Sequence, residues 1–271
     1  MEYARIIITG ASSGLGAAFA EALVRAGAEL LLIARRRERL ESLAARLSEQ
    51  CPGVVPRVLP CDLAAPAERQ RLCAELAALP PVPTLLINNA GLGDYGEFAD
   101  ADPQKLDRLM QVNMLAVVEL TRAMLPTMLS AGGGIINIAS LAADLFIPDF
   151  ALYAASKSFV ASFSEALRVE LRHSGVRVLA VCPGPVHTEF GSVAQRPGRD
   201  RGDIPLKSCL YTPISTVVRG SLRALAAHRA RYYPSKRIWL AGCLLRLLPL
   251  WLMRLILHTR PRRVHRQGGA A

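Results

Sequence analysis

Cysteine pairs and histidine clusters are missing from this sequence. None of its six cysteines belongs to a CxxC pair, and no histidines have the spacing of metal ligands. The cysteines are scattered over the chain, at Cys51, Cys61, Cys73, Cys182, Cys209 and Cys243. This pattern supports neither a disulfide framework nor a metal site. We therefore expect reduced thiols in a cytoplasmic protein that binds no metal.

Low-complexity segments, internal repeats and a secretory signal are also lacking. Of the 271 residues, 51% are hydrophobic and only 20% are charged, so the chain can bury enough apolar surface to fold. The first apolar run, Arg5 to Thr9, stops at Gly10 and is too short for a signal sequence. We expect one globular domain that starts close to the N-terminus.

Acidic residues are absent from the last quarter of the chain. Residues 204–271 contain 13 of the 33 lysines and arginines and no aspartate or glutamate. Residues 1–203 are nearly balanced, with 20 basic and 22 acidic residues, so the net charge of +11 originates in the C-terminal segment. Such asymmetry indicates an anionic surface or partner near the C-terminus rather than a property of the whole fold.

Short aliphatic runs alternate with longer amphipathic segments from Ile6 to Cys182. The runs lack polar alternation, which is typical of strands in a sheet that is covered on both faces. The predicted strands are Ile6–Ile8, Glu29–Ile33, Val54–Pro60, Thr84–Asn88, Gly134–Ala139 and Val176–Cys182. The predicted helices are Gly14–Ala26, Arg37–Gln50, Ala65–Leu79, Pro103–Ala131, Tyr153–Ser174 and, after a loop at Pro183–Ile204, Ile214–His228. This alternation predicts an α/β fold with a doubly wound parallel sheet.

A glycine-rich turn, TGASSGLG at Thr9–Gly16, directly follows the first predicted strand. Glycines at positions 10, 14 and 16 would let the backbone turn tightly and approach a pyrophosphate. The N-terminus of the next helix would stabilise the phosphate charge. A tight connection without a ligand is the structural alternative, but the flanking strand and helix favour a dinucleotide.

The end of the second predicted strand indicates which dinucleotide is bound. An acidic residue there would bind the 2′-hydroxyl of the adenosine ribose, but the sequence continues from Ala34 with Arg35, Arg36 and Arg37. A guanidinium suits a 2′-phosphate, and we assign that role to Arg35, the arginine nearest the strand. Arg36 and Arg37 are expected to be solvated residues that open the next helix.

Two further strand ends carry polar residues. Asp62 follows the third strand, where its carboxylate either accepts a hydrogen bond from an adenine amino group or caps the next helix. Asn88-Asn89-Ala90-Gly91 ends the fourth strand, at the edge of the sheet where ligands bind. Either asparagine could instead cap its own turn.

Tyr153 and Lys157 are four residues apart in the sequence YAASK, and Ser140 precedes them at the end of the fifth strand. Residues at i and i+4 share a helix face, so the hydroxyl and the ammonium can reach the same ligand. The pKa of an unperturbed tyrosine is about 10, and a nearby ammonium favours its phenolate. The pair is therefore a candidate acid–base device, although the spacing alone also fits a packed ring beside a solvated charge.

Together these motifs resemble the short-chain dehydrogenase/reductase family, in the order in which that family carries them. The match extends from Arg5 to Thr188 and consists of TGASSGLG, Asp62, NNAG at Asn88–Gly91, Asn113, Ser140, YAASK and PGPVHT at Pro183–Thr188. The resemblance implies a Rossmann fold and hydride transfer between a nicotinamide and a carbonyl or alcohol carbon. It agrees with Arg35 in implying NADP(H), with NAD(H) as the less favoured cofactor.

The resemblance also implies a role for each site residue. Tyr153 is the catalytic acid/base, and Lys157 lowers its pKa and binds the nicotinamide ribose. Ser140 binds the substrate oxygen, and Asn113 supports a proton-relay water. The residues implied to contact the cofactor are Gly10, Ser12, Ser13, Gly14, Leu15, Gly16, Arg35, Asp62, Leu63, Asn89, Ala90, Gly91, Tyr153, Lys157, Pro183, Gly184, Val186 and Thr188.

The resemblance explains little of the chain after Asp203. We expect residues 1–203 to form the dinucleotide-binding catalytic part, and residues 204–271 a substrate lid and a hydrophobic, basic helical extension of the same domain. Within Ile238–Leu257, sixteen of twenty residues are apolar, but two arginines and a proline argue against a membrane span. A cap over the substrate cleft, a subunit interface and a hairpin on an anionic membrane stay open as alternatives. The hairpin would use Trp239, Trp251, Arg260, Arg262, Arg263 and Arg266.

Each alternative leaves the neighbouring cleft apolar, so a lipophilic carbonyl or alcohol is the expected substrate. Residues 94–98, 141–149 and 190–210 are expected to shape the pocket, and reduction is the expected direction because NADPH pools usually drive it. In the resembled family, Pro103–Ala131 and Tyr153–Ser174 commonly pair subunits, which favours a homo-oligomer. The basic tail offers no aromatic stacking platform, so no nucleic acid is expected. A non-catalytic nucleotide sensor or scaffold on the same fold is the alternative function.

Overall fold

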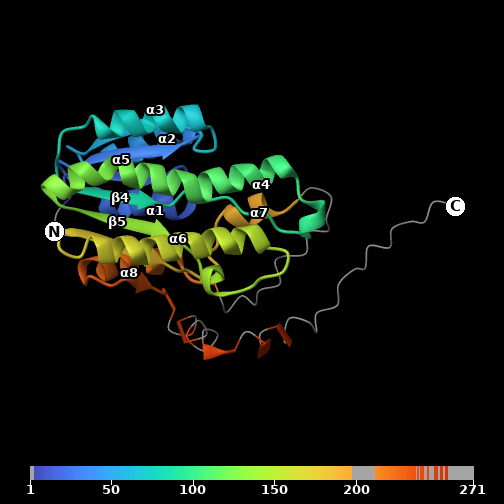
Figure 1. The fold of residues 1–271 in the computed structure, drawn as a ribbon. Coiled ribbons are helices and arrows are strands. Elements are labelled where there is room, and N and C mark those ends of the chain that lie inside the picture. Colours follow the sequence, from blue (N-terminus) through green and yellow to red (C-terminus); the bar gives the residue numbers. More distant parts are fainter. Residues whose placement is uncertain are drawn as a thin grey trace.

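A computed structural model of the chain describes residues 3–196 and 211–235, together with residues 237, 239, 240, 243, 247–249, 251, 252, 254 and 255. Parallel strands form one sheet in the order β3-β2-β1-β4-β5-β6-β7 (Figure 1). They are β1 (Arg5–Thr9), β2 (Glu29–Ala34), β3 (Val55–Pro60), β4 (Thr84–Asn88), β5 (Gly133–Ile138), β6 (Val176–Val181) and β7 (Arg231–Tyr232). The doubly wound α/β fold is confirmed. Only β7 was not predicted, because two residues leave no sequence pattern.

Helices cover both faces of the sheet (Figure 1). Those on one face are α1 (Gly14–Leu23), α2 (Arg37–Gln50) and α8 (Ile214–Ala226), and those on the other are α3 (Pro66–Ala77), α5 (Ala116–Ala131) and α6 (Ala151–Glu170). Alternate strand residues enter the two cores, since Ile6 and Ile8 pack toward one face and Ile7 toward the other. All three are almost completely buried, which explains why the strands are apolar throughout.

The predicted helix Pro103–Ala131 is divided by a wider turn. It comprises α4 (Pro103–Met110), the π-helical turn η2 (Gln111–Leu115) and α5. Apolar periodicity alone does not reveal such a turn, so the sequence predicted one helix. By length and composition the whole stretch could cross a membrane, but core helices of soluble proteins pass the same test, and α5 packs on the sheet.

A buried polar network connects α5 and α6 through the sheet. Asn88 of β4 and Asn137 of β5 are register partners, and the Asn88 Nδ2 atom donates hydrogen bonds to Asn137 Oδ1 at 2.8 Å and Thr121 Oγ1 at 3.2 Å. Asn137 in turn donates to the Ser164 hydroxyl of α6 at 2.9 Å. The network fixes the two helices relative to the strands whose carboxyl ends carry the candidate site.

The C-terminal extension is described only in part. Trp239, Leu247 and Trp251 are 51%, 79% and 65% exposed. Residues 197–210 of the expected lid and Arg260, Arg262, Arg263 and Arg266 lie outside the described residues. The exposure of Trp239, Leu247 and Trp251 favours an external partner for these residues over burial in a cap against the rest of the chain.

Candidate active site

The glycine-rich turn lies at the carboxyl end of β1, against the residues that follow β4. Gly10 has a φ of +66°, and a Cβ atom there would lie 2.9 Å from the Ala90 Cα atom. A Cβ atom on Gly16 would collide with the Gly10 carbonyl oxygen. The Asn89 Nδ2 atom donates to the carbonyl oxygens of Thr9 at 2.9 Å and Gly10 at 3.3 Å. The Asn89 side chain therefore shapes the glycine-rich turn after β1, rather than its own turn after β4.

The N-terminus of α1 is suited to an anion. Ser13 precedes the helix in an extended conformation, no side chain caps its first N–H groups, and the first turn contains no acidic residue. The first-turn N–H groups, which belong to Gly14, Leu15 and Gly16, have no intrahelical acceptors and can bind phosphate oxygens. A Cβ atom on Gly14 would lie 3.1 Å from the Thr188 Cγ2 atom, so the loop after β6 faces this turn directly.

Arg36, rather than Arg35, contacts the glycine-rich turn. Its Nη2 atom donates to the Ser12 and Ser13 hydroxyl oxygens, both at 3.0 Å. Arg36 is exposed and opens α2, as expected, and its contacts with the turn were not predicted. Although its backbone is the N-cap of α2, its side chain extends back to the turn, and such a long-range contact leaves no mark in the local sequence. Arg35 precedes Arg36 in sequence and is exposed. The guanidinium groups of Arg35 and Arg36 and the hydroxyls of Ser12 and Ser13 form a candidate 2′-phosphate site.

Asp62, after β3, accepts two hydrogen bonds. Its Oδ1 atom accepts from the Ala64 backbone N–H at 3.0 Å and its Oδ2 atom from Arg108 Nη2 at 2.8 Å. Burial acts to raise the pKa of Asp62, but the hydrogen bonds from Arg108 and Ala64 and the charges of Arg108 and Arg35 together outweigh it and hold that pKa below its usual value. The helix-capping alternative is wrong, because the N-cap of α3 is Ala65. Leu63, the next predicted contact, is buried in the core.

Asn113 lies in the π-helical turn η2 and joins it to two other segments. Its Oδ1 atom accepts from the Leu92 N–H at 2.8 Å, and its Nδ2 atom donates to the Leu92 carbonyl oxygen at 2.9 Å and the Ser156 hydroxyl at 3.0 Å. The Ser156 hydroxyl donates to the Tyr153 carbonyl oxygen at 2.7 Å. The Asn113 side chain therefore positions the helix that carries Tyr153.

Tyr153 and Lys157 face the same edge of the sheet from α6. Lys157 is 4% exposed; its Nζ atom donates to the Ile138 carbonyl oxygen at 2.8 Å and lies 5.8 Å from the centre of the Tyr153 ring. Burial lowers the pKa of Lys157 to about 8. Burial raises the pKa of Tyr153 to about 12, and the hydrogen bond with Ser140 acts in the opposite direction. A Cβ atom on Gly91 would lie 3.3 Å from the Lys157 Nζ atom, so this glycine leaves room beside the ammonium.

The loop after β6 reaches the same edge. The Leu141 N–H donates to the Pro183 carbonyl oxygen at 2.8 Å, which ties this loop to η3 (Leu141–Asp144), the turn that follows Ser140. Gly184 is partly buried, and Val186 packs against the core. The structure thus brings the predicted site residues together along the carboxyl edge of the sheet, where parallel α/β folds bind ligands.

Three aromatic rings near Tyr153 were missed by the sequence reasoning. The ring centres of Phe150 and Phe190 lie 5.3 Å and 5.2 Å from that of Tyr153, and Tyr95 lies 5.0 Å from Phe150. Phe190 begins α7 (Phe190–Ala194), and Tyr95 follows β4. No periodicity links residues from three separate segments. Their signal was only that Tyr95 and Phe190 fall in segments expected to shape the pocket.

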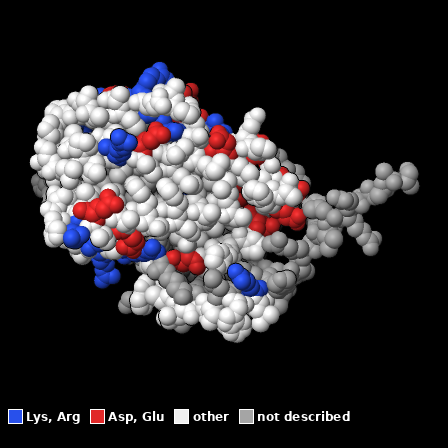
Figure 2. All heavy atoms as spheres, viewed as in Figure 1, with Lys and Arg blue, Asp and Glu red and all other residues white. Residues whose placement is uncertain are grey.

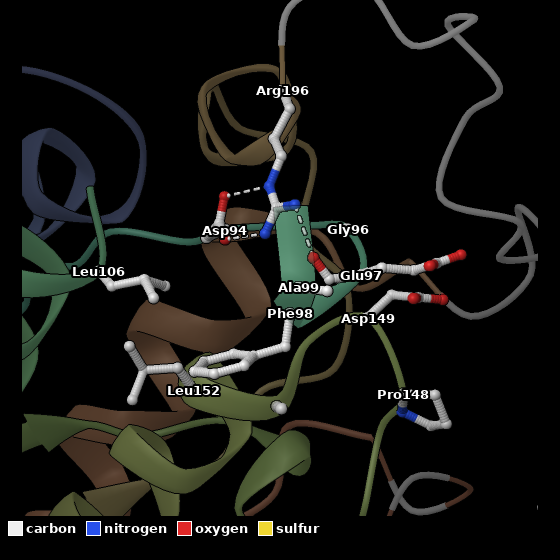
Figure 3. A pocket seen from close by; sticks show the side chains of 11 residues that line it. Asp94, Gly96, Glu97, Phe98, Ala99, Leu106, Pro148, Asp149, Leu152 and Arg196 are labelled. Atoms are coloured by element: carbon white, nitrogen blue, oxygen red, sulfur yellow. Dashed lines mark hydrogen bonds and ion pairs between the residues drawn. The ribbon is translucent and has the colours of Figure 1, made fainter. Parts of the chain in front are cut away.

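A cavity of about 280 Å³ lies next to the start of α6 (Figure 3). Arg196 extends along it and binds both carboxylate oxygens of Asp94, at 3.0 Å and 2.5 Å. Phe98 and Leu152 line its apolar side. Tyr153 is not among the lining residues, although it directly follows one of them. Two of the segments expected to shape the pocket, 94–98 and 141–149, contribute to this cavity, and so does Arg196 from the third.

Known proteins resemble this chain in both sequence and structure. The family model for short chain dehydrogenases matches residues 4–197. Sulfoacetaldehyde reductase 2 of Chromohalobacter salexigens is 35% identical over 250 residues, which cover 87% of this chain and 96% of the relative. The solved short-chain dehydrogenase from Sphingobium yanoikuyae in complex with NADPH is 31% identical, with a TM-score of 0.79 over 98% of both chains. The solved bulky-bulky ketone specific alcohol dehydrogenase from Comamonas testosteroni is 28% identical, with a TM-score of 0.75 over 100% of this chain and 98% of the other.

Proposed function

This chain belongs to the short chain dehydrogenase family of oxidoreductases, and we propose that it reduces a lipophilic carbonyl compound with NADPH. The observation that carries the proposal is the convergence of Ser140, Tyr153 and Lys157 at one sheet edge. Ser140 and Tyr153 share a hydrogen bond, and the buried Lys157 ammonium lies beside the Tyr153 ring. A proton donor and a cation are thus available where the family's chemistry takes place.

The residues present fit a nicotinamide dinucleotide that carries a 2′-phosphate. Arg35 and Arg36 with the Ser12 and Ser13 hydroxyls would bind the 2′-phosphate, since guanidinium groups match phosphate oxygens. The uncapped first turn of α1 would bind the pyrophosphate. No carboxylate follows β2 to bind a free 2′-hydroxyl, which favours NADP(H) over NAD(H). The NADPH complex of the Sphingobium relative supports the same cofactor.

The side chains of this protein supply the proton for the reduction. When bound, NADPH provides a hydride for the carbonyl carbon. Tyr153 then donates its phenolic proton to the carbonyl oxygen, so that an alcohol forms and a phenolate stays behind. The Lys157 ammonium stabilises that phenolate, and the Ser140 hydroxyl orients the carbonyl oxygen. Asn113 holds α6, and with it Tyr153, in position.

The rings of Phe150 and Phe190 support a lipophilic substrate. Both rings pack against the Tyr153 ring, Phe150 from the residue before α6 and Phe190 from α7. A carbonyl group that reaches the Tyr153 hydroxyl would therefore have apolar surface beside it. The relatives' names include both a small polar aldehyde and bulky ketones. The argument for an apolar substrate therefore rests on the aromatic residues of this chain.

The test is cofactor-dependent turnover by the wild type and by Tyr153→Phe, on carbonyl compounds graded from small and polar to long and apolar. We expect turnover with NADPH that rises with the apolar length of the substrate. Loss of the phenolic proton should lower kcat by about 100-fold or more in Tyr153→Phe, with NADPH binding retained. Tyr232→Phe is the matched control, because it removes a hydroxyl from β7 whose hydrogen bond goes to the Thr216 carbonyl oxygen.

Each part of the proposal has its own contrary result. Faster turnover with NADH would contradict the cofactor assignment, and activity confined to small polar ketones would contradict the substrate class. NADPH binding without turnover of any carbonyl compound would favour the non-catalytic nucleotide sensor. Undiminished activity in Tyr153→Phe would show that Tyr153 is not the proton donor.

A second copy of this chain is the proposed partner of the face over α5 and α6. Charged side chains gather mostly at the margins of this face, and its centre is largely uncharged (Figure 2). The large exposed apolar residues of α4, η2, α5 and α6 are Met110, Leu115, Leu129 and Val169. Their burial between two subunits would explain why they are apolar, and a homo-oligomer is the expected state in solution.

An anionic membrane is the proposed partner of the C-terminal extension. Trp239, Leu247 and Trp251 are more than half exposed, and residues 204–271 carry only positive formal charge. The measurement is co-sedimentation with vesicles of anionic or of neutral lipid. We expect binding to the anionic vesicles that falls in a Trp239→Ala, Trp251→Ala double variant. Equal recovery with both lipids, or none with either, would contradict the proposal.

A further inference from the structure

Glu189, which follows the loop after β6, bridges Arg36 at the N-cap of α2 and Arg39 within that helix. Its Oε2 atom accepts from Arg36 Nη1 at 2.8 Å, and its Oε1 atom from Arg39 Nη1 at 2.5 Å. The same Arg36 guanidinium donates through Nη2 to the Ser12 and Ser13 hydroxyls. One arginine therefore serves both the turn and a carboxylate that follows the loop after β6.

An adenosine 2′-phosphate would need these same donors. Carboxylate and phosphate oxygens both accept hydrogen bonds from the edges of a guanidinium, so either anion can bind Arg36. Two anions at contact distance repel each other, so they compete for the site rather than share it. The hydrogen bond from Arg39, which has the larger effect, and the one from Arg36 lower the pKa of Glu189 to about 2, so the carboxylate is ionised at neutral pH.

We infer that Glu189 is a specificity-determining residue, which occupies the arginine donors of the 2′-phosphate site and weakens the binding of 2′-phosphorylated nucleotides. This inference rests on the proposed NADP(H) function. It predicts that Glu189 releases Arg36 when a 2′-phosphate binds, and that nucleotides without this phosphate leave the bridge intact. The phosphate at the other end of the adenosine binds the α1 N-terminus and is not affected.

The bridge also links the 2′-phosphate site to the substrate side of the protein. Thr188 and Phe190 flank Glu189 in sequence, and the Phe190 N–H donates to the Thr188 hydroxyl at 3.3 Å. Phe190 packs against the Tyr153 ring. If a phosphate replaces Glu189 as the partner of Arg36, the released Glu189 can move, and the next residue, Phe190, contacts the proposed proton donor Tyr153.

The test measures binding of two mononucleotide probes by calorimetry, so it does not depend on turnover. The probes are adenosine 2′,5′-bisphosphate and adenosine 5′-monophosphate, and the proteins are the wild type, Glu189→Gln and Glu189→Asp. In Glu189→Gln we expect the Kd of the bisphosphate to fall by about 3- to 10-fold, as expected for the loss of exposed competing ion pairs, and that of the monophosphate to stay unchanged. Glu189→Asp keeps the charge on a shorter side chain and should give a smaller gain.

Glu41→Gln is the matched control. Glu41 is an exposed carboxylate of α2 that pairs with Arg37 at 3.5 Å, and it is 55% exposed against 45% for Glu189. Its removal changes the net charge equally but leaves Arg36 bound to Glu189. The gain specific to Glu189→Gln should also shrink at high salt, because exposed ion pairs are screened.

The results separate this inference from the proposed function. An unchanged or higher Kd of the bisphosphate in Glu189→Gln, or an equal gain in Glu41→Gln, overturns the inference and leaves the NADP(H) assignment standing. If the wild type binds both probes equally and Glu189→Gln prefers the bisphosphate, the inference holds and the wild-type cofactor preference falls. If neither protein prefers the bisphosphate, both fall.

Discussion

The Lys157 ammonium donates a hydrogen bond to the carbonyl oxygen of Ile138, at 2.8 Å, and so joins the helix that carries Tyr153 to the strand that leads to Ser140. This bond fixes the lysine without neutralising it. Burial disfavours the charged form and lowers the pKa of Lys157 to about 8. Holding the charge in place is therefore expected to reduce the stability of the folded protein.

Lys157→Met should be more stable than the wild type at pH 7, by about 1–3 kcal/mol, and inactive as a reductase. Between the folded pKa of about 8 and the ordinary lysine pKa of 10.5, the unfolded chain binds the extra proton, so wild-type stability rises with pH. The advantage of the variant should therefore diminish over this range. Denaturant titrations at pH 7 and pH 10 measure it. A variant that is less stable than the wild type at pH 7 would show that the bond to Ile138 outweighs the burial of charge.

The rate of carbonyl reduction should fall above about pH 8. Tyr153, with a pKa raised to about 12, keeps its proton there, but Lys157 loses its charge and no longer stabilises the phenolate. The pH profile of kcat/KM measures this limb. Lys157→Arg carries a charge that does not titrate in this range, so its residual activity should lack the limb. A limb at the same pH in both proteins would assign it to another group.

Gly93→Ala should disturb the substrate side and leave nucleotide binding intact. A Cβ atom there would lie 2.7 Å from the Phe190 Cζ atom and 2.8 Å from the Ala194 Cβ atom, so α7 would have to shift. We expect kcat/KM for the carbonyl compound to fall by about 5- to 100-fold, in line with the usual cost of overpacking. Gly191→Ala is the control, because its Cβ atom would meet nothing within 4 Å. Equal losses in both variants would mean that contact with Phe190 is not the cause.

Val169→Arg should dissociate the proposed homo-oligomer. Val169 of α6 is 58% exposed, and a charge there would be desolvated if this residue is buried between subunits. Light scattering should give a larger mass for the wild type than for the variant. Val55→Arg, at a residue that is 54% exposed on the edge strand β3, should leave the mass unchanged. A monomeric wild type would contradict the assembly itself.

The sequence revealed the strands and the motif residues because both depend on local order. Buried strands must be apolar along their length, and a turn that approaches a phosphate must carry glycine at set positions. The site residues of the motifs then converge because parallel strands end at one edge. The side-chain contacts of Arg36 were not predicted for the opposite reason, since its partners Ser12, Ser13 and Glu189 come from distant parts of the chain. The aromatic rings around Tyr153 belong to the same class of contact, which local pattern cannot show.

The hydrogen bonds among Thr121, Asn88, Asn137 and Ser164 hold α5 and α6 in fixed positions on the sheet beneath the site. Each side chain belongs to a different element, so a slip of either helix along the sheet would break a bond that water cannot replace. We therefore expect conformational changes during a catalytic cycle to occur in the loops above the sheet edge. In a nucleotide titration followed by NMR, the side-chain amide signals of Asn88 and Asn137 should stay still while backbone signals around Phe190 move.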